Sequence, residues 1–171
     1  MNIVFMQFRL QMSTKHLYTA GYEGLDIEAF IARLKVEGVS SIIDVRELPL
    51  SRKKGFSKTA LSARLKAAGI GYFHAPQLGC PKEIRNRYRA DNDWAAYTRD
   101  FLAYLDTQGK VVRELANFAR STSACLLCFE ADYDMCHRTY VARAAQRAGA
   151  PTVRHITAKA TIADRPVRLV A

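Results

Sequence analysis

The sequence lacks several features that would assign it to a common class of protein. Its 171 residues include only four cysteines, without the spacing of a disulfide framework. This excludes a disulfide-dense small domain and fits a reducing cytoplasm. No stretch approaches the roughly 20 apolar residues that a membrane span needs, so we expect no membrane partner. At this length we expect a single domain with its own hydrophobic core.

The common phosphate-binding motifs are absent too. The segment 19–24 (TAGYEG) does not match the glycine-rich dinucleotide fingerprint, and there is no Walker loop. The Cys-x5-Arg loop of thiol phosphatases is missing, because Asp134 stands six residues after Cys128. A nucleotide ligand would therefore need a site of a different design.

Cysteine spacing gives little indication of a metal. Cys125 and Cys128 have the spacing of a zinc knuckle, but on a strand residues three apart point to opposite faces. A site built from Cys128, Cys136, His137 and Cys80 is conceivable. On spacing alone we predict no metal and no cofactor.

Acidic residues are scarce in one quarter of the chain. The whole chain has 26 Lys+Arg and 16 Asp+Glu, a net charge of +10. The segment 46–90 contains 11 Lys+Arg but only Glu47 and Glu83, so it carries +9 of that charge. A concentrated basic field attracts phosphates and polyanions. We therefore expect an anionic small molecule or a nucleic acid as partner, although solvated helix faces would also explain the charge.

Part of this basic segment interleaves cations with an aromatic ring, as in proteins that hold single strands. Trp94 and Tyr97 follow closely, although core packing on a helix face also explains Trp94. The candidate nucleic-acid-binding residues are Lys53, Lys54, Arg85, Arg87, Tyr88 and Arg89.

The apolar pattern alternates between short strand-like runs and helical periodicity. Strands are expected at 17–20, 41–46, 71–74, 124–129 and 152–156. Helices are expected at 26–37, 57–69, 93–105, 110–120 and 137–148, with 77–92 as a long irregular loop. This alternation predicts an α/β fold, a single-domain three-layer α/β/α sandwich with a mainly parallel, roughly five-stranded sheet.

The ends of the chain are expected to lie outside this domain. Residues 1–14 form an extension that makes a poor signal peptide, and Met12 is a possible start. The α/β domain takes 15–160, and 161–171 is a tail or an edge strand, with 167–170 as the candidate strand.

Unusual polar residues gather where the expected strands end. Ligands of open α/β sheets bind beyond the carboxyl ends of the strands. This rule selects candidate catalytic residues, which are Asp44, Glu130, Cys136 and His137. It also selects candidate anion-binding residues, which are Tyr22, Arg46, Arg52 and Arg138.

The segment 128–138 carries the richest chemistry. A thiol at the start of a helix, beside His137 and Arg138, has a lowered pKa. Arg138 stands where the helix dipole disfavours a cation, which points to a bound anion. Cys136 can also be a plain helix-start residue, and Glu130 a structural partner of Arg138 or Arg46.

Asp44 and Arg46 are two apart on a strand and so share a face. The carboxylate can fix the arginine's planar fork, either as a structural lock or as an oriented phosphate clamp.

Several short motifs occur together and in order. They are Tyr18-Thr-Ala-Gly-Tyr22-Glu, Ile43-Asp44-Val-Arg46, Ser51-Arg52-Lys-Lys-Gly-Phe56, Leu78-Gly79 and Cys128-Phe-Glu130…Cys136-His137-Arg138. In this combination the chain resembles the family catalogued as domain of unknown function 488, from about residue 17 to 156. Many members resemble Thr-Ile-Gly-His-Ser at the first strand, where this chain has Ala20, Tyr22 and Glu23. The resemblance implies a fold and a site location and no settled activity.

Three hypotheses for the function remain. The first is an enzyme acting on a phosphate-containing substrate such as a nucleotide or nucleic acid. The second is a non-catalytic nucleic-acid-binding module. The third is a thiol enzyme or sulfur carrier with Cys128 or Cys136 as the nucleophile.

Overall fold

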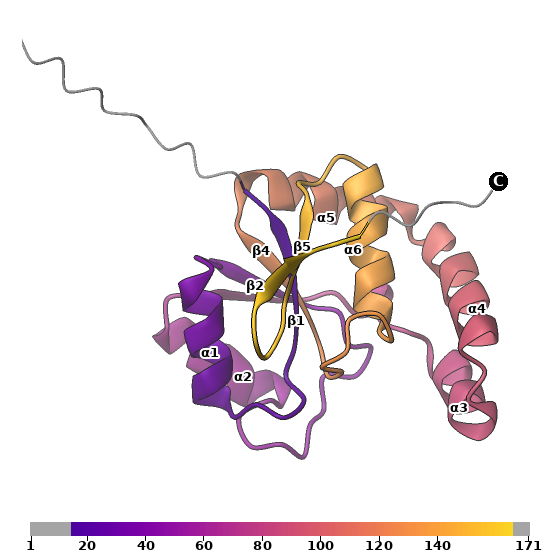
Figure 1. The fold of residues 1–171 in the computed structure, drawn as a ribbon, viewed down its shortest axis with the longest axis horizontal. Helices are drawn as coiled ribbons and strands as arrows, with labels where there is room; N and C mark the ends of the chain where they lie inside the picture. The colour runs from indigo at the N-terminus through magenta and orange to yellow at the C-terminus, as the bar shows by residue number, and fades with distance from the viewer. Residues whose placement is uncertain (1–14, 166–171) are drawn as a thin grey trace, which may run out of the picture.

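The protein is a six-stranded sheet with helices on both faces (Figure 1), as seen in a computed structural model that describes residues 15–165. The strands are β1 (Leu17–Gly21), β2 (Ser41–Asp44), β3 (Gly71–His74), β4 (Ala124–Cys128), β5 (Val153–Ile156) and β6 (Thr161–Ala163). Their order in the sheet is β3-β2-β4-β1-β5-β6. All neighbours are parallel except β6, which runs antiparallel to β5. The mixed α/β sandwich is confirmed, with six strands instead of the five predicted.

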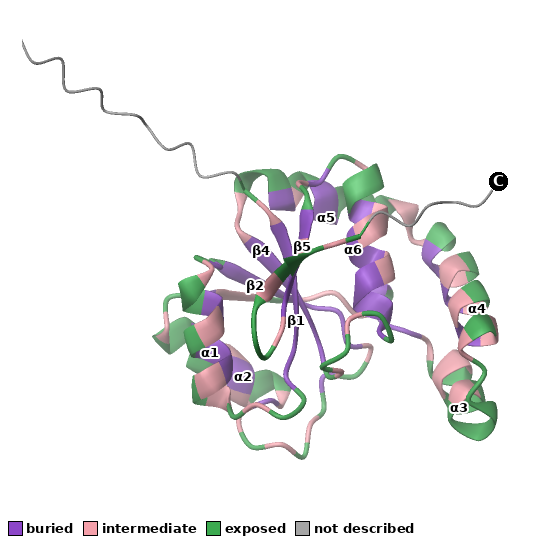
Figure 2. Cartoon of the chain, viewed as in Figure 1, coloured by how far each residue is buried: buried purple, intermediate pink, exposed green. Residues whose placement is uncertain are grey.

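Helices cover the sheet in two groups. They are α1 (Ile27–Val36), α2 (Lys58–Ala67), α3 (Lys82–Asp91), α4 (Trp94–Thr107), α5 (Gly109–Ser121) and α6 (His137–Arg147), with a 3-10 turn, η1, at Pro76–Leu78. One apolar cluster joins α1 and α2 to one face of the sheet, and another joins α4, α5 and α6 to the other face. Figure 2 shows the buried residues concentrated on the central strands and on the inner sides of these helices.

Two aspartates set the starts of helices as the sequence indicates. The Asp26 carboxylate accepts a 2.8 Å hydrogen bond from the Ala29 N–H at the start of α1. The Asp93 carboxylate does the same for the Ala96 N–H of α4, at 2.9 Å. Each side chain satisfies one of the backbone donors that a helix leaves free at its first turn.

The stretch 77–92, predicted as an irregular loop, is mostly helical, so that prediction is wrong. It contains the end of η1 and the whole of α3. Helix α3 has no fully buried residue and is dominated by charged side chains, so it lacks the continuous apolar stripe that reveals a helix in sequence. Only Ile84 and Tyr88 pack against the core, and Asn92 ends the helix in the left-handed conformation, with φ at 55°.

The chain reverses direction across the sheet between β1 and β4. From β1 it passes through α1 toward β2, whereas from β4 it passes through α6 toward β5 on the other face. Such a switch point opens a crevice at the carboxyl ends of the two strands. The Glu23 N–H donates to the Phe129 carbonyl at 2.9 Å, and the Ala131 N–H donates to the Glu23 carboxylate at 2.9 Å. These bonds hold the loop after β4 against the end of β1.

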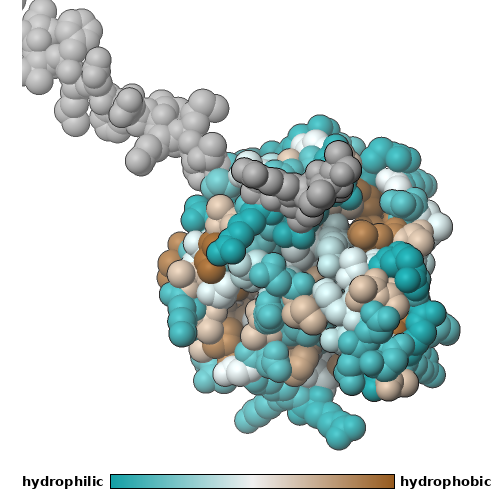
Figure 3. Space-filling view, turned by 45° about the vertical axis from the view of Figure 1, so that its right-hand side comes forward, coloured by the Kyte–Doolittle hydropathy of each residue, from teal (hydrophilic) through white to brown (hydrophobic). Residues whose placement is uncertain are grey.

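The predictions for the chain ends fall partly outside the described residues. The extension 1–14 and the candidate strand 167–170 lie beyond residues 15–165, while β6 lies within the segment 161–171. Among the described residues, no helix combines the length and apolar character of a membrane span. Figure 3 shows polar residues over most of the visible face, with hydrophobic residues in separate patches.

We predict that Gly21→Ala displaces the loop after β4. A Cβ at Gly21 would lie 1.8 Å from the Glu130 carbonyl oxygen, and that oxygen is backbone and cannot rotate away. The expected loss is about 1–3 kcal/mol in the free energy of unfolding, as for other overpacked sites. Urea denaturation followed by circular dichroism measures it. In Gly109→Ala the nearest atom is 3.4 Å away, at the tip of Arg113, so we expect a change below about 1 kcal/mol. Equal denaturation midpoints for the two variants would contradict this account.

Candidate functional site

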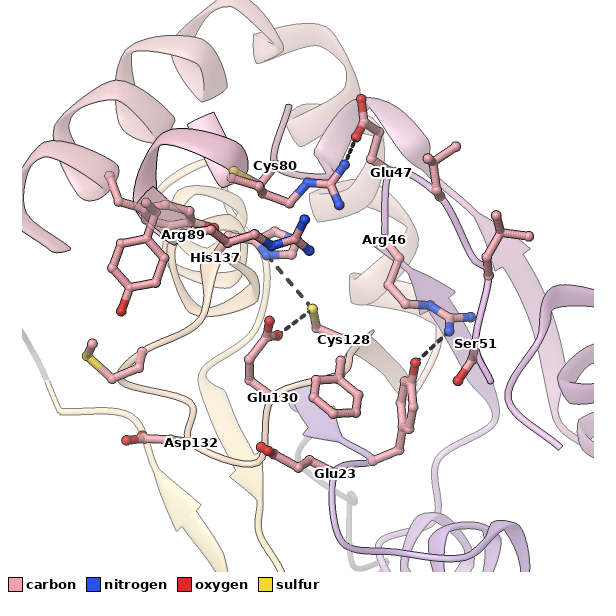
Figure 4. Close-up of a pocket in the computed structure, with 18 of the residues that line it drawn as sticks. Glu23, Arg46, Glu47, Ser51, Cys80, Arg89, Cys128, Glu130, Asp132 and His137 are labelled. Atoms are coloured by element: carbon pink, nitrogen blue, oxygen red, sulfur yellow. Dashed lines mark hydrogen bonds and ion pairs between the residues drawn. The ribbon is translucent and has the colours of Figure 1, made fainter. Parts of the chain in front are cut away.

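A pocket of about 690 Å³ opens at the carboxyl edge of the sheet, over the switch point (Figure 4). Its base includes Cys128 at the end of β4, Glu130 in the following loop and His137 at the start of α6. One side is formed by the loop after β2, and the other by α3 and the beginning of α4. The pocket therefore gathers residues that are more than a hundred positions apart in the chain.

An ion pair between Asp44 and Arg46 is buried beside this pocket. The Arg46 Nε donates to Asp44 Oδ1 at 2.8 Å and Nη2 donates to Oδ2 at 2.5 Å. The Nη1 atom donates to the Tyr22 hydroxyl and to the Phe56 carbonyl, both at 2.9 Å, and the Tyr72 hydroxyl donates to Asp44 Oδ2 at 2.7 Å. Burial alone would lower the pKa of Arg46, but the Asp44 hydrogen bonds and charge raise it above its ordinary value. Most of the guanidinium donors are thus already used within the protein.

The residues of this network differ in whether a ligand could reach them. Tyr22 and Arg46 line the pocket, whereas Asp44 is completely buried behind Arg46 and does not. The Tyr22 ring stacks on Phe56 with centroids 4.2 Å apart. Asp44 therefore holds Arg46 in place, and only Arg46 and Tyr22 are within reach of a ligand.

Two thiols, a carboxylate and an imidazole meet at the base of the pocket. The Cys128 and Cys136 thiols donate to the same oxygen, Glu130 Oε2, at 2.8 Å and 3.2 Å. The Cys128 sulfur is also 3.8 Å from His137 Nδ1. The His137 Nε2 atom is 2.9 Å from the Val45 carbonyl oxygen, which can only accept. The hydrogen of a neutral His137 is therefore on Nε2, and the lone pair on Nδ1 faces the sulfur.

The ionisable groups of this thiol cluster (Cys128, Glu130, Cys136 and His137) shift one another's pKa values. The Cys136 hydrogen bond, together with burial and nearby negative charge, raises the pKa of Cys128 well above its ordinary value. Burial would also raise the pKa of Cys136, but the Cys128 hydrogen bond, the Arg138 charge and His137 lower it well below the ordinary value. Burial raises the pKa of Glu130. The pKa of His137 is raised too, because the Cys136 hydrogen bond and charge outweigh its burial. Cys136 is therefore the more acidic of the two thiols.

Arg138 holds the loop that carries Glu130. Its guanidinium is 1% exposed and donates to the Glu130 carbonyl at 2.6 Å and to the Ala131 carbonyl at 3.3 Å. It does not line the pocket, although the sequence placed it among the anion ligands. From outside the pocket, its positive charge lowers the pKa of Cys136.

The six residues predicted to contact nucleic acid separate into two groups. Arg85, Tyr88 and Arg89 line the pocket, as does Arg52, which was predicted to bind an anion, and Arg85 forms an ion pair with Glu47. The other three do not line it: Lys53 donates to the Tyr22 carbonyl at 3.3 Å, Lys54 is exposed, and Arg87 pairs with Asp100. Within residues 15–165, Arg52 and Arg89 form no ion pair.

The pocket has mixed charge. Its four arginines are matched by four carboxylates, from Glu23, Glu47, Glu130 and Asp132. The positive charge of the four pocket arginines, all from the segment 46–90, is therefore matched by an equal number of acids from the loops after β1, β2 and β4.

Sequence reasoning missed part of the aromatic wall. Trp94 and Tyr97 both line the pocket, and their rings stack with centroids 4.6 Å apart and an interplanar angle of 13°. Their position just after a basic, aromatic segment was the available signal, but the alternative of core packing could not be separated from it. Cys80 also lines the pocket, 1% exposed, with burial raising its pKa to about 11.

The chain matches one known protein family over more than half of its length. The profile described as "Domain of unknown function DUF488" matches residues 26–145, well over half of the sequence. The chain belongs to the domain of unknown function 488 family. No curated protein and no solved structure matches it.

The region that matches the family includes most of the pocket. It runs from the cap of α1 to α6 and so contains the Asp44–Arg46 pair and the whole thiol cluster. Strand β1 and Tyr22 lie before it. In this member of the family, the Tyr22 hydroxyl accepts the Arg46 hydrogen bond at the end of that first strand.

We predict that Asp44→Asn destabilises the fold strongly. The substitution leaves the Arg46 charge buried without its counter-ion, which typically costs about 3–5 kcal/mol. Glu28→Gln removes an acid of the same kind from an exposed pair with Arg64, where we expect less than about 1 kcal/mol. Chemical denaturation of both variants measures the difference. A similar small loss in both would show that the buried pair is not a stability determinant.

Proposed function

We propose that this protein is an enzyme that acts on a phosphate-containing ligand, a nucleotide or a nucleotide unit of a nucleic acid, bound in the pocket at the sheet edge. One observation carries the proposal: an aromatic wall, two arginines without ion-pair partners among the described residues, and the acid–base pair Glu130 and His137 all line one cavity. A volume of about 690 Å³ lies within the usual range of about 300–1,000 Å³ for small-ligand sites.

The aromatic wall fits a nucleobase. Tyr88, Trp94 and Tyr97 form a compact group, with centroid separations of 4.6–5.5 Å. Stacking on such rings is favourable for every base because each base has a flat π-face. The base would lie on the side formed by α3 and α4, away from the thiol cluster.

Arg52 and Arg89 would bind the phosphate. They approach the pocket from opposite sides, one from the loop after β2 and the other from α3. A guanidinium offers a planar fork that matches phosphate oxygens, and a hydrogen bond to a charged group contributes about 1.5–3 kcal/mol. Arg46 adds positive charge at the floor, with its orientation fixed by Asp44.

The chemistry would come from the thiol cluster. Glu130 and His137 line the pocket and are the candidate general acid and base. Cys128 also lines the pocket, whereas Cys136 touches Glu130 from behind and positions it. The separate hypothesis of a thiol nucleophile is less well supported, because Cys128, which lines the pocket, has a raised pKa and Cys136 does not line it. All four cysteines are free thiols, which supports a reducing compartment, and we place the enzyme in the cytoplasm.

We predict that nucleotides quench the fluorescence of Trp94, which is the single tryptophan of the chain. Titration with mono- and dinucleotides, corrected for absorption with free tryptophan, gives the affinity. Arg52→Ala and Arg89→Ala should each weaken binding about 10- to 100-fold, because each removes a charged hydrogen bond. Arg113→Ala, on α5 outside the pocket, should leave the titration unchanged. Quenching that is equal in all four proteins would place the nucleotide elsewhere.

We predict that turnover depends on the carboxylate of the cluster. A panel of nucleotides and short DNA and RNA strands, analysed by chromatography, would identify the substrate. Glu130→Gln keeps the shape but removes the base, with an expected loss of about 100-fold or more. Cys136→Ser is expected to reduce the rate through the position of Glu130. Full activity in both variants would remove these residues from the mechanism.

The exposed face of α3 supports a second candidate, the nucleic-acid-binding module without catalysis. This helix buries no residue and presents Lys82, Arg85, Arg87 and Arg89. Binding of a single strand through these phosphate contacts would weaken steeply as salt rises, with a slope of about −0.7 per phosphate neutralised. Retention of strand binding in Glu130→Gln, without turnover of any ligand in the wild type, would favour this function over the enzyme.

A further inference from the structure

We propose that Cys128, Cys136 and His137 form a binding site for one zinc ion at the base of the pocket. The two sulfur atoms and His137 Nδ1 all lie within 4.8 Å of one another, and all three residues are buried. Two thiolates and one imidazole are a ligand set that zinc prefers. This inference goes beyond the proposed function and does not require it. With zinc bound, Cys128 and His137 act as ligands, and Glu130 is left as the acid–base group of the proposed function.

The separations fit a tetrahedral zinc ion. Zinc lies about 2.3 Å from sulfur and 2.0–2.1 Å from nitrogen, which puts a sulfur and a nitrogen ligand about 3.5 Å apart. The Cys128 sulfur and His137 Nδ1 are 3.8 Å apart. This pair is within a few tenths of an ångström of its separation in a zinc complex, and no two of the three ligand atoms are more than 4.8 Å apart.

The histidine is already oriented as a metal ligand. A histidine that binds a metal through one ring nitrogen usually donates the other N–H to a carbonyl or carboxylate, which fixes its tautomer. The His137 Nε2 atom is 2.9 Å from the Val45 carbonyl oxygen, in a buried position. This contact leaves the Nδ1 lone pair directed at the sulfur atoms.

The ligands lie at the end of a central strand and at the start of the helix that follows it. Cys128 ends the central strand β4, Cys136 is the residue before α6, and His137 is its first residue. The spacing alone was uninformative, because Cys125 points to the opposite face of the sheet and belongs to the other apolar cluster. Of the four residues that the sequence offered as a conceivable site, the fold brings Cys128, Cys136 and His137 together, and Cys80 does not belong to the group.

Glu130 lies beside the three ligands, on the pocket side. Its Oε2 atom is 2.8 Å from the Cys128 sulfur and 3.2 Å from the Cys136 sulfur. With zinc bound, two thiolates and this carboxylate carry three negative charges, matched by the ion and by Arg138. The thiols release their protons to solvent as the ion binds. Three protein ligands leave one tetrahedral position unfilled, and Glu130 is the side chain nearest the two sulfur ligands.

Metal titration of the full-length protein tests this site without any nucleotide. The protein is treated with a chelator under reducing conditions, dialysed and titrated with Zn²⁺ alone or Co²⁺ alone. We expect one equivalent to bind, with thiolate-to-cobalt charge-transfer absorption in the Co²⁺ form. Cys128→Ser, Cys136→Ser and His137→Ala should each weaken binding at least 100-fold.

Cys125→Ala is the matched control, because it removes a buried thiol from the opposite face of the sheet and should leave one equivalent bound. Glu130→Gln should also retain the ion while losing turnover, which separates failure of this site from failure of the proposed function. Circular dichroism of each variant checks that lost binding is not lost folding. Absence of binding to the wild type, binding unchanged in Cys128→Ser, or formation of a Cys128–Cys136 disulfide in place of a metal complex would each overturn the proposal.

Discussion

The hydrogen bonds from Arg138 to the loop after β4 are the constraint on which the site depends. Arg138 is the largest side chain that the described part of the chain buries almost completely. By donating to the Glu130 and Ala131 carbonyls, it satisfies backbone acceptors in a loop that has left the sheet. The same loop is pressed against Gly21, where even a methyl group would collide with the Glu130 carbonyl. The guanidinium holds the loop on one side and Gly21 packs against it on the other. In this position of the loop, the Glu130 carboxylate contacts the two sulfur atoms.

This arrangement explains why a cation stands in the first turn of α6, where the helix dipole disfavours it. The sequence analysis interpreted Arg138 as a ligand for a bound anion. The partners in the structure are internal: two carbonyl oxygens and the negative charge of the thiol cluster. Arg138, which the helix dipole disfavours at this position, does have a specific partner, but that partner is the protein's own backbone.

The parts of the fold that follow from local pattern were predictable from sequence. Apolar runs located the five parallel strands, and the Asp26 and Asp93 caps located two helix starts. Helix α3 was missed, because a helix that packs through two side chains leaves no periodic signal. The rule that ligands bind beyond the carboxyl ends of the strands selected Glu130 and His137, and both line one pocket. It could not show that Asp44 lies behind Arg46 or that Arg87 pairs with Asp100, because these outcomes depend on rotamers and on contacts between distant elements.

The weak attachment of α3 has a consequence for how this family can diversify. The chemistry-bearing groups are fixed to the central strands, whereas Arg85, Tyr88 and Arg89 are presented by a helix that contributes almost nothing to the core. Substitutions at the exposed positions of α3, away from Ile84 and Tyr88, should therefore cost little stability while changing one side of the pocket. Under the proposed function, ligand choice and reactivity would then depend on separate parts of the fold.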